Sequence, residues 1–289
     1  MTSVTSQAQI PSKRGLVALR ADHLPQAVSL SAALGWPYRE EDWRFALELG
    51  HGIGVESDGR LAATALWWPY EKAFASFGMI IVSPALQGRG IGRMLMDELL
   101  RQAEGRTIIL NSTREGYRLY ERLGFVPCGQ VNQHQSVLVT APPEPRANGP
   151  IRPLRPEDIG AIRDLDCRAS GMGRTQLLDA LFTVGNVAVI ERERRVQGYA
   201  CVRRWGRGVV IGPVIARDAI DAKALIATLA AEHRGGFVRI DVPATSGLSP
   251  WLEQIGLRHV DQVVSMVRGQ APTRAADATL FALSNQSLG

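Results

Sequence analysis

The chain has 289 residues, which is long for one typical domain and suits two, and its 45% hydrophobic content supplies apolar material for two cores. The three cysteines, Cys128, Cys167 and Cys201, are widely spaced and form no Cys/His cluster, so neither a disulfide framework nor a zinc site is expected. The sequence has no signal-peptide pattern and no membrane-length apolar run, which predicts a soluble cytoplasmic protein with no membrane partner.

The net charge is +5, and the basic excess lies in the second half of the chain. Six arginines crowd one predicted hairpin there: Arg192, Arg194, Arg195, Arg203, Arg204 and Arg207. A basic patch can attract nucleic acid or an acidic ligand. Because Glu191 and Glu193 lie among these arginines and no nucleic-acid motif accompanies them, a solvated hairpin face is the favoured interpretation, and a nucleic-acid partner is not expected.

The first half of the chain reads as one α/β domain over residues 15–140, after a flexible tail at 1–14. Its hydrophobic patterns predict, in chain order, a strand at 16–19, a helix capped by Asp22 and running through Leu34, a helix at 41–49, strands at 53–56, 60–67 and 77–82, a helix at 91–102, a strand at 107–110, a helix at 112–123 and a strand at 136–140. The Asp58–Gly59 pair between two of these strands is typical of a β-hairpin.

The second half repeats this pattern after a proline-rich linker at 141–150. Residues 151–159 align with 16–24, each a strand followed by a helix start. Residues 255–257, followed by a strand at 263–268, align with residues 123–125, followed by the strand at 136–140. The sequence therefore predicts two copies of one domain, the second at 151–270. In the tail at 271–289, residues 275–283 are expected to form a docking helix.

Residues 77–103 form the most informative stretch, a buried strand followed by a glycine-rich loop and an amphipathic helix. Such a unit presents free backbone N–H groups and the positive end of a helix dipole to a phosphate. The dinucleotide spacing fails because its third glycine would fall at Arg93, and the P-loop spacing fails because no Gly-Lys pair follows. The spacing that fits is Gln-x-x-Gly-x-Gly, from Gln87 to Gly92.

This loop resembles the acyl-CoA loop of the GNAT acetyltransferase superfamily. The resemblance implies an α/β fold with an α+β mixed sheet: two tandem GNAT-like domains, each a central, mostly antiparallel sheet with splayed strands four and five, flanked by helices. In that family the pantetheine arm of acetyl-CoA lies in the splay like an extra strand, and the pyrophosphate binds loop amides. The cofactor-binding residues implied are Ile80, Ile81, Val82, Gln87, Gly88, Arg89, Gly90, Ile91, Gly92 and Arg93.

A second family motif, Leu-Tyr-x-x-x-Gly-Phe, is present at residues 119–125. By resemblance, Tyr120 is the catalytic residue that donates a proton to the cofactor sulfur, which suits a phenol of pKa about 10. The alternative is a core aromatic on a helix face shared with Tyr117 and Leu123. Asn111, just after the strand at 107–110, matches an asparagine that many family members place near the cofactor, although its distance from Tyr120 is longer than usual.

The second copy lacks the loop. Its counterpart, residues 210–218, has a strand before it and a helix after it but no glycines at the tight positions, so a side chain would occupy the space that a pyrophosphate needs. The whole pattern looks like a bacterial tandem GNAT whose C-terminal copy is divergent. We therefore expect one active site per chain and a second copy that shapes an acceptor cleft or stabilises the pair.

The resulting hypothesis is an acetyl-CoA-dependent N-acetyltransferase that acts on a primary amine of a small molecule or peptide, directly and without an acyl-enzyme. The alternative is a non-catalytic acyl-CoA-binding module whose second domain docks a partner through the arginine-rich hairpin. No general base is identified; Glu71, His51 and Glu48 are candidates but are better explained as surface residues. Three aromatic residues, Trp67, Trp68 and Tyr70, lie at or just after the end of the strand at 60–67. Packing is the favoured role for Trp67, whereas Trp68 and Tyr70 could either pack or form an aromatic wall for the acceptor.

Overall fold

The computed structural model of the chain describes residues 15–143 and 146–289. Within it the chain forms two compact units: unit 1 holds Met1–Leu66 and Met79–Gln102, and unit 2 holds Trp67–Gly78 and Ala103–Gly289. The predicted tail at 1–14 and residues 144 and 145 of the predicted linker lie outside the described residues. Over the described ranges, no helix is long and apolar enough to cross a membrane, and no group of three or more His, Cys, Asp and Glu residues could hold a metal ion.

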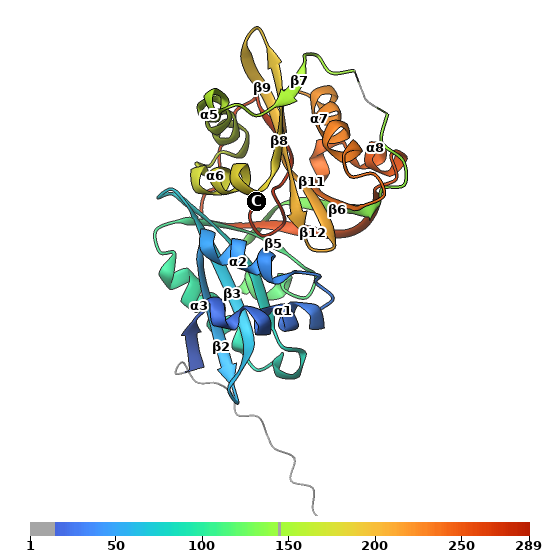
Figure 1. Cartoon of the computed structure of the whole chain (residues 1–289). Coiled ribbons are helices and arrows are strands. Elements are labelled where there is room, and N and C mark those ends of the chain that lie inside the picture. Colours follow the sequence, from blue (N-terminus) through green and yellow to red (C-terminus); the bar gives the residue numbers. More distant parts are fainter. Residues whose placement is uncertain (1–14, 144–145) are drawn as a thin grey trace, which may run out of the picture. The chain divides into compact units, whose positions relative to one another are not determined.

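Unit 1 contains strands in the order β1-β2-β3-β4, together with α-helices that come before β2 and after β4 in the chain (Figure 1). Its elements are β1 (Leu16–Ala18), η2 (Ala21–His23), α1 (Leu24–Ala33), α2 (Glu40–Leu49), β2 (His51–Ser57), β3 (Arg60–Tyr70), β4 (Phe74–Val82), η3 (Pro84–Leu86) and α3 (Ile91–Gln102), with the ends of β3 and the start of β4 in unit 2. The helices at 41–49 and 91–102 and the hairpin are confirmed. The apolar stripe of α3 explains its packing, because Leu95, Met96 and Leu99 are fully buried.

Asp22 does not cap a helix, contrary to the sequence prediction. Residues 21–23 form a short 3₁₀ turn, and the N–H of Arg20 donates to Nδ1 of His23 at 3.0 Å. Asp22 is exposed, and Leu24 and Pro25 begin the α-helix instead. A proline in the first helical turn needs no N–H partner, which explains why the helix starts there.

Unit 2 contains the remaining elements, and its strand order is β4-β5-β12-β6-β11-β10-β9-β8-β7, with β13 paired to β10. They are β5 (Thr107–Ser112), α4 (Tyr117–Arg122), β6 (Val126–Val137), β7 (Ile151–Pro153), η4 (Pro156–Asp158), α5 (Ile159–Ser170), α6 (Thr175–Val184), β8 (Asn186–Arg192), β9 (Arg195–Trp205), β10 (Gly208–Ala216), α7 (Ala219–Ala231), β11 (Phe237–Pro243), η5 (Ala244–Ser246), α8 (Ser249–Gln254), β12 (Arg258–Arg268) and β13 (Thr279–Ala282). Figure 1 shows α5 and α6 on one side of the β7–β11 strands and α7 and α8 on the other.

The two copies exchange their last long strands. Strand β12, from the second copy, pairs antiparallel with β5 of the first, while β6, from the first copy, pairs antiparallel with β11 of the second. The exchanged strands also pair with each other, with Val131 opposite Val263. The predicted linker at 141–150 falls between β6 and β7 in the sequence, and the structure pairs β6 with a strand of the second copy and β12 with a strand of the first.

Three predicted elements differ from the structure. The helix expected at 112–123 is only Tyr117–Arg122, because residues 107–112 continue as a strand against β12. The strand expected at 136–140 is instead Val126–Val137, which starts directly after Phe125. The expected docking helix at 275–283 is the strand β13, because its Leu280 and Ala282 pair with Ile215 and Val214. In each case pairing with a distant strand outweighs the local pattern.

Candidate functional site

The glycine-rich loop of unit 1 has the geometry of an anion cradle at a helix N-terminus. Gly88 and Gly90 adopt left-handed backbone conformations with φ of +75° and +80°, and a Cβ atom on either would meet no atom within 4 Å. The first helical bond runs from the N–H of Met94 to the carbonyl of Gly90 at 3.0 Å, so the N–H groups of residues 91–93 precede the hydrogen-bonded turns of α3. Open space at two glycines and amides that precede the first helical hydrogen bond therefore coincide with the positive end of a helix dipole.

The side chain of Gln87 closes this loop onto β4. Its Nε2 donates to the carbonyl of Val82 at 3.1 Å. Along β4, Ile81 is buried while Ile80 and Val82 are half-buried, as expected for a strand with one face in the core. Arg93 is exposed at the start of α3, where its Nε donates to both carboxylate oxygens of Asp97 at 2.9 Å. Unit 1 thus brings together the strand and loop residues that the sequence assigned to the cofactor.

Met79 interrupts β4 with a left-handed conformation, at φ of +49°. Its carbonyl accepts from Oγ1 of Thr64 at 2.9 Å, and its side chain is buried. A non-glycine residue held at positive φ inside a strand stores on the order of 1–3 kcal/mol of strain. Met79 is not among the residues predicted from the sequence, although the Gly78–Met79 step inside an apolar strand was a signal for it.

In unit 2, β4 pairs in parallel with β5 only from Phe74–Thr107 to Phe77–Leu110. We call the place where this pairing ends the first fork. Asn111, the next residue of β5, uses both ends of its side chain there: Nδ2 donates to the carbonyl of Gln286 at 2.7 Å, and Oδ1 accepts from Oγ of Ser265 at 2.6 Å. A role for Asn111 in holding a cofactor would require the exchange of one of these bonds.

Tyr120 lies on α4 in unit 2, and its side chain is buried. Its ring packs edge to face against Phe125, with ring centroids 6.0 Å apart, and the N–H of Phe125 donates to the carbonyl of Tyr120 at 3.1 Å. Burial raises the pKa of the Tyr120 phenol well above its usual value. The group therefore keeps its proton in neutral and alkaline solution and is suited to donate a proton or a hydrogen bond rather than to act as a base.

The second copy has an equivalent fork between β10 and β11, which we call the second fork. Pairing there runs from Val209–Val238 to Ile211–Ile240, and the next residues are Gly212 and Asp241. By the same register, Gly78 corresponds to Gly212 and Asn111 to Asp241. The two copies therefore end their central strand pairing at corresponding positions.

The second fork is filled by the chain itself. Strand β13 pairs antiparallel with Val214–Ala216 of β10, and the N–H of Leu283 donates to the carbonyl of Asp241 at 2.9 Å. A Cβ atom on Gly212 would lie 1.8 Å from the carbonyl oxygen of Leu283, so only glycine fits there. An extended segment thus occupies the place that corresponds to Ile80–Val82 in the first copy.

The residues 284–289, here called the C-terminal segment, continue from the second fork to the first. Oγ of Ser76 donates to the carbonyl of Ser287 at 2.6 Å, and the hydroxyl of Tyr70 donates to the carbonyl of Leu288. The segment has no hydrophobic period and carries no motif, so sequence reasoning could not place it. Only the structure brings it to the strands of the first copy.

The remaining sequence candidates are not gathered into a site. Glu48, His51 and Glu71 are exposed, as a surface interpretation predicts. The aromatic residues Trp67, Trp68 and Tyr70 are all buried. The guanidinium of Arg106 lies 5.6 Å from the ring centre of Trp67, and Tyr70 binds the C-terminal segment, so these two rings have packing roles. Among the cysteines, Cys128 and Cys167 are exposed and Cys201 is buried.

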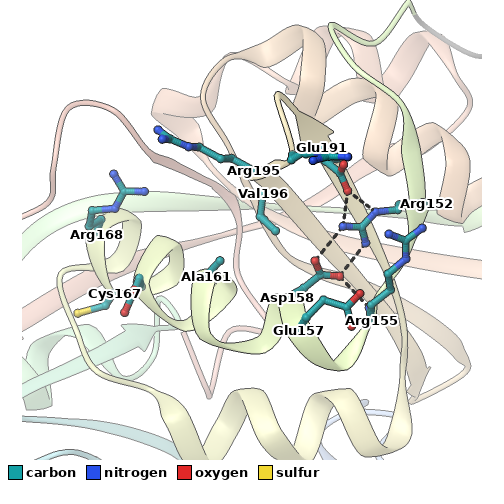
Figure 2. A pocket seen from close by; sticks show the side chains of 12 residues that line it. Arg152, Arg155, Glu157, Asp158, Ala161, Cys167, Arg168, Glu191, Arg195 and Val196 are labelled. Carbon is teal, nitrogen blue, oxygen red and sulfur yellow. Dashed lines mark hydrogen bonds and ion pairs between the residues drawn. The ribbon is translucent and has the colours of Figure 1, made fainter.

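A cavity of about 1020 Å³ lies in unit 2 beside α5 and the β8–β9 hairpin. Figure 2 shows Arg152 between two carboxylates: it donates to Asp158 at 2.7 and 2.8 Å and to Glu191 at 2.7 Å. The Arg152 guanidinium holds the pKa of Asp158 below its usual range. Both acidic and basic side chains line this cavity, and Arg192 of the hairpin pairs with Asp221.

Family comparisons match both halves of the chain. The model described as "Acetyltransferase (GNAT) family" matches residues 18–125, and one described as "Acetyltransferase (GNAT) domain" matches residues 162–282. An uncharacterized N-acetyltransferase of Bacillus subtilis, YitH, is 27% identical over 95% of this chain and 98% of its own. A holothin acyltransferase of a Pseudoalteromonas species is 24% identical over 78% of this chain and 76% of its own.

Solved structures show the same fold over nearly the whole chain. A putative acetyltransferase from Pyrococcus horikoshii aligns with a TM-score of 0.80 at 20% identity and covers 99% of this chain and 100% of its own. A tandem GNAT protein from the clavulanic acid biosynthesis pathway aligns with a TM-score of 0.62 at 15% identity, over 89% of this chain and 99% of its own. The mixed sheet flanked by helices is thus shared with proteins of low sequence identity, one of which is described as a tandem GNAT protein.

Proposed function

Because the chain belongs to the GNAT acetyltransferase family and carries two of its domains in tandem, we propose that it is an acetyl-CoA-dependent N-acetyltransferase. The acceptor is a primary amine of a small molecule or peptide, and transfer is direct. The observation that carries the proposal is the loop at 87–93, where two left-handed glycines and a helix N-terminus leave open space for a pyrophosphate. The named acyltransferase among the relatives supports the same chemistry.

The residues present fit the cofactor. Gly88 and Gly90 keep the space beside the loop clear of side chains, and the amides of residues 88–93 would hold the pyrophosphate. The backbone of Ile80–Val82 would hold the pantetheine arm, as β13 is held by the corresponding strand of the second copy. When bound, acetyl-CoA supplies an activated acetyl thioester and a thiolate leaving group.

Two features of the chain then assist the transfer. Met79 interrupts β4 with a left-handed conformation, and we assign the N–H groups beside it to stabilisation of negative charge on the carbonyl oxygen. Tyr120, whose raised pKa keeps it protonated, is assigned the role of proton donor to the leaving sulfur. A cofactor-binding role is less well supported for Asn111, because both ends of its side chain already form hydrogen bonds within the chain.

The rival function is an acyl-CoA-binding module without catalysis, whose second copy docks a partner. The experiment that separates the two combines CoA calorimetry with an acceptor screen over amino acids, polyamines, aminoglycosides and peptides, in which release of free CoA thiol is followed. Amine-dependent thiol release supports the enzyme. Tight CoA binding without turnover for any acceptor class would support the binding module instead.

A further inference from the structure

The cavity beside α5 and the β8–β9 hairpin lies wholly in unit 2, and its volume of about 1020 Å³ is large enough for a small molecule. Figure 2 shows Ala161 and Val196 between two charged ends, with the side chains of Arg168 and Arg195 at one of them. At the other end lies the cluster of Arg152, Asp158 and Glu191, here called the Arg152 cluster. The cavity is therefore lined by charged groups around a small apolar centre.

Arg152 is not available to a ligand, because all five of its N–H donors are used. Its Nε and Nη2 pair with Glu191 at 2.7 and 2.5 Å, and its Nη1 and Nη2 donate to Asp158 at 2.7 and 2.8 Å. Nη1 also donates to the carbonyl of Pro153 at 3.1 Å. Asp158 in addition accepts the N–H of Arg155 at 2.8 Å. The Arg152 cluster thus forms a fixed wall of the cavity rather than a binding group.

Three other lining arginines are available. Over the part of the chain that the structure describes, the guanidinium groups of Arg155, Arg194 and Arg195 make no hydrogen bond and no close ion pair, and all three residues are exposed. The lining carboxylates outside the Arg152 cluster are only Glu157 and Asp164. Because a planar guanidinium can bind a carboxylate or a phosphate through two parallel N–H bonds, this excess of arginine favours an anionic ligand.

The turn of the β8–β9 hairpin is built from residues that its backbone does not favour. Glu193 and Arg194 form this turn with φ of +49° and +61°, a conformation that favours Gly, Asn and Asp. The β2–β3 hairpin of the first copy has strands of the same lengths and the turn Asp58–Gly59. Arg194 therefore takes the place of a glycine, and its side chain lines the cavity. Backbone strain of this kind is typical of ligand-binding positions.

The open space also distinguishes the second copy from the first. Gln26, the third residue of α1, accepts the N–H of Leu61, the second residue of β3, at 2.7 Å through its Oε1. The residues at the same places in α5 and β9 are Ala161 and Val196, and both line the cavity. Ala161 is too short to form such a bridge, so the space between helix and hairpin stays open in the second copy.

From these features we propose that the cavity binds a small molecule with two or more anionic groups, carboxylate or phosphate, which Arg155, Arg194 and Arg195 hold. Several charges are needed because a single exposed ion pair contributes little in water. The inference does not rest on the proposed acetyl transfer, since every lining residue belongs to the second copy.

Calorimetric titration of the full chain with citrate, a carboxylate ligand, and with pyrophosphate, a phosphate ligand, tests the site. At least one of the two should bind, and more weakly at high salt. Arg194→Gly should weaken that binding by about 5-fold. Its melting temperature should stay the same or rise, because glycine suits the turn, and a purely structural role of Arg194 would not combine these two results.

Two further variants separate the site from a general effect of charge. Arg195→Gln should also weaken binding, whereas Arg60→Gln is the matched control, because Arg60 begins β3 as Arg195 begins β9 and should not affect affinity. Ala161→Gln should weaken binding without removing a charge, because it places on α5 the side chain that the first copy has there.

Pyrophosphate is also a candidate ligand of the loop at 87–93, so Gly90→Trp is titrated beside the other variants. Binding that is lost in Gly90→Trp and kept in Arg194→Gly overturns the inference. Absence of binding of both anions to the full chain overturns it as well. An equal loss of affinity in Arg60→Gln and Arg195→Gln does so too, because it would show that only the net charge matters.

Discussion

Gly90 lies in the loop proposed to bind the pyrophosphate of CoA, and the proposal depends on its having no side chain. At φ of +80° a side chain costs roughly 1–2 kcal/mol, which the fold can absorb, but it would also enter the open space beside the loop. We therefore expect Gly90→Trp to abolish CoA binding while the protein stays folded, measured by calorimetry and a melting curve. Gly59→Trp is the matched control, because Gly59 is also left-handed with open space around it but lies in the β2–β3 turn. Retained CoA affinity in Gly90→Trp would contradict the loop assignment.

Tyr120 is the residue on which the chemical step depends. Tyr120→Phe keeps the ring against Phe125 but removes the proton, so turnover should fall by roughly 10²-fold with little change in acetyl-CoA affinity. Because the pKa of Tyr120 is raised, the wild-type rate should show no loss from ionisation of this group up to about pH 10. Tyr117→Phe on the same helix is the control. Unchanged turnover of Tyr120→Phe across the pH range would remove Tyr120 from the mechanism.

At the scale of elements, the exchanged strands β6 and β12 hold the two copies together, and a buried histidine lies between them and α8. His134 on β6 donates from Nδ1 to the carbonyl of Leu257 at 3.0 Å, and its Nε2 lies 3.0 Å from Oγ of Ser249. Its ring is stacked 5.2 Å from that of His259, with Glu253 and Asp241 as nearby carboxylates. Burial lowers the pKa of His134, with a smaller contribution from His259.

This shift predicts acid sensitivity of the exchanged strands. Because the folded pKa lies below the unfolded value of about 6.5, the stabilisation is fully present above that pH and is lost as the pH falls through the folded pKa. The melting temperature should therefore fall between pH 7 and pH 5, and His134→Gln should flatten that slope. His51→Gln, at an exposed position, should leave the slope unchanged. A slope that persists in His134→Gln would assign the acid sensitivity to another group.

The C-terminal segment depends on the buried Arg174–Asp166 pair, which also receives the hydroxyl of Tyr199 at 2.5 Å. Arg174→Met would leave Asp166 as an uncompensated buried charge, so the free energy of unfolding should fall by about 3–5 kcal/mol. Arg168→Met breaks the exposed pair with Asp277 and should change it by about 1 kcal/mol or less. Denaturant titration of both variants measures the difference, and equal losses would mean that the buried pair has no special role.

At the scale of the whole molecule, the second copy differs from the first in that β13 fills its fork. The second copy lacks the glycine loop, and β13 occupies its fork, so two independent features exclude an acyl-CoA there. Strand exchange explains why such a copy is retained, since β5 of the first copy pairs with β12 of the second. The divergent copy thus completes the sheet of the other.

Calorimetric titration with CoA should accordingly give one site per chain. Gly90→Trp should remove that site without revealing another. A stoichiometry of two, or residual tight binding in Gly90→Trp, would mean that the second fork opens to a ligand despite β13. The same titration with Leu280→Ala, which weakens the packing of β13, checks whether a second site appears when the fork is loosened.

Local sequence determined the loop, the helix after it and the repeat, because left-handed glycines, capping and hydrophobic periods act over a few residues. Gly88, Gly90 and the stripe of α3 could therefore be interpreted without a structure. Strand exchange, the filling of the second fork and the position of residues 284–289 could not be predicted in this way, because each depends on hydrogen bonds between residues more than 40 positions apart. The contact of Asn111 with Gln286 is an example: neither residue carries a local signal of the other. Long-range strand pairing of this kind, which the local sequence does not encode, therefore decides that the second fork is filled.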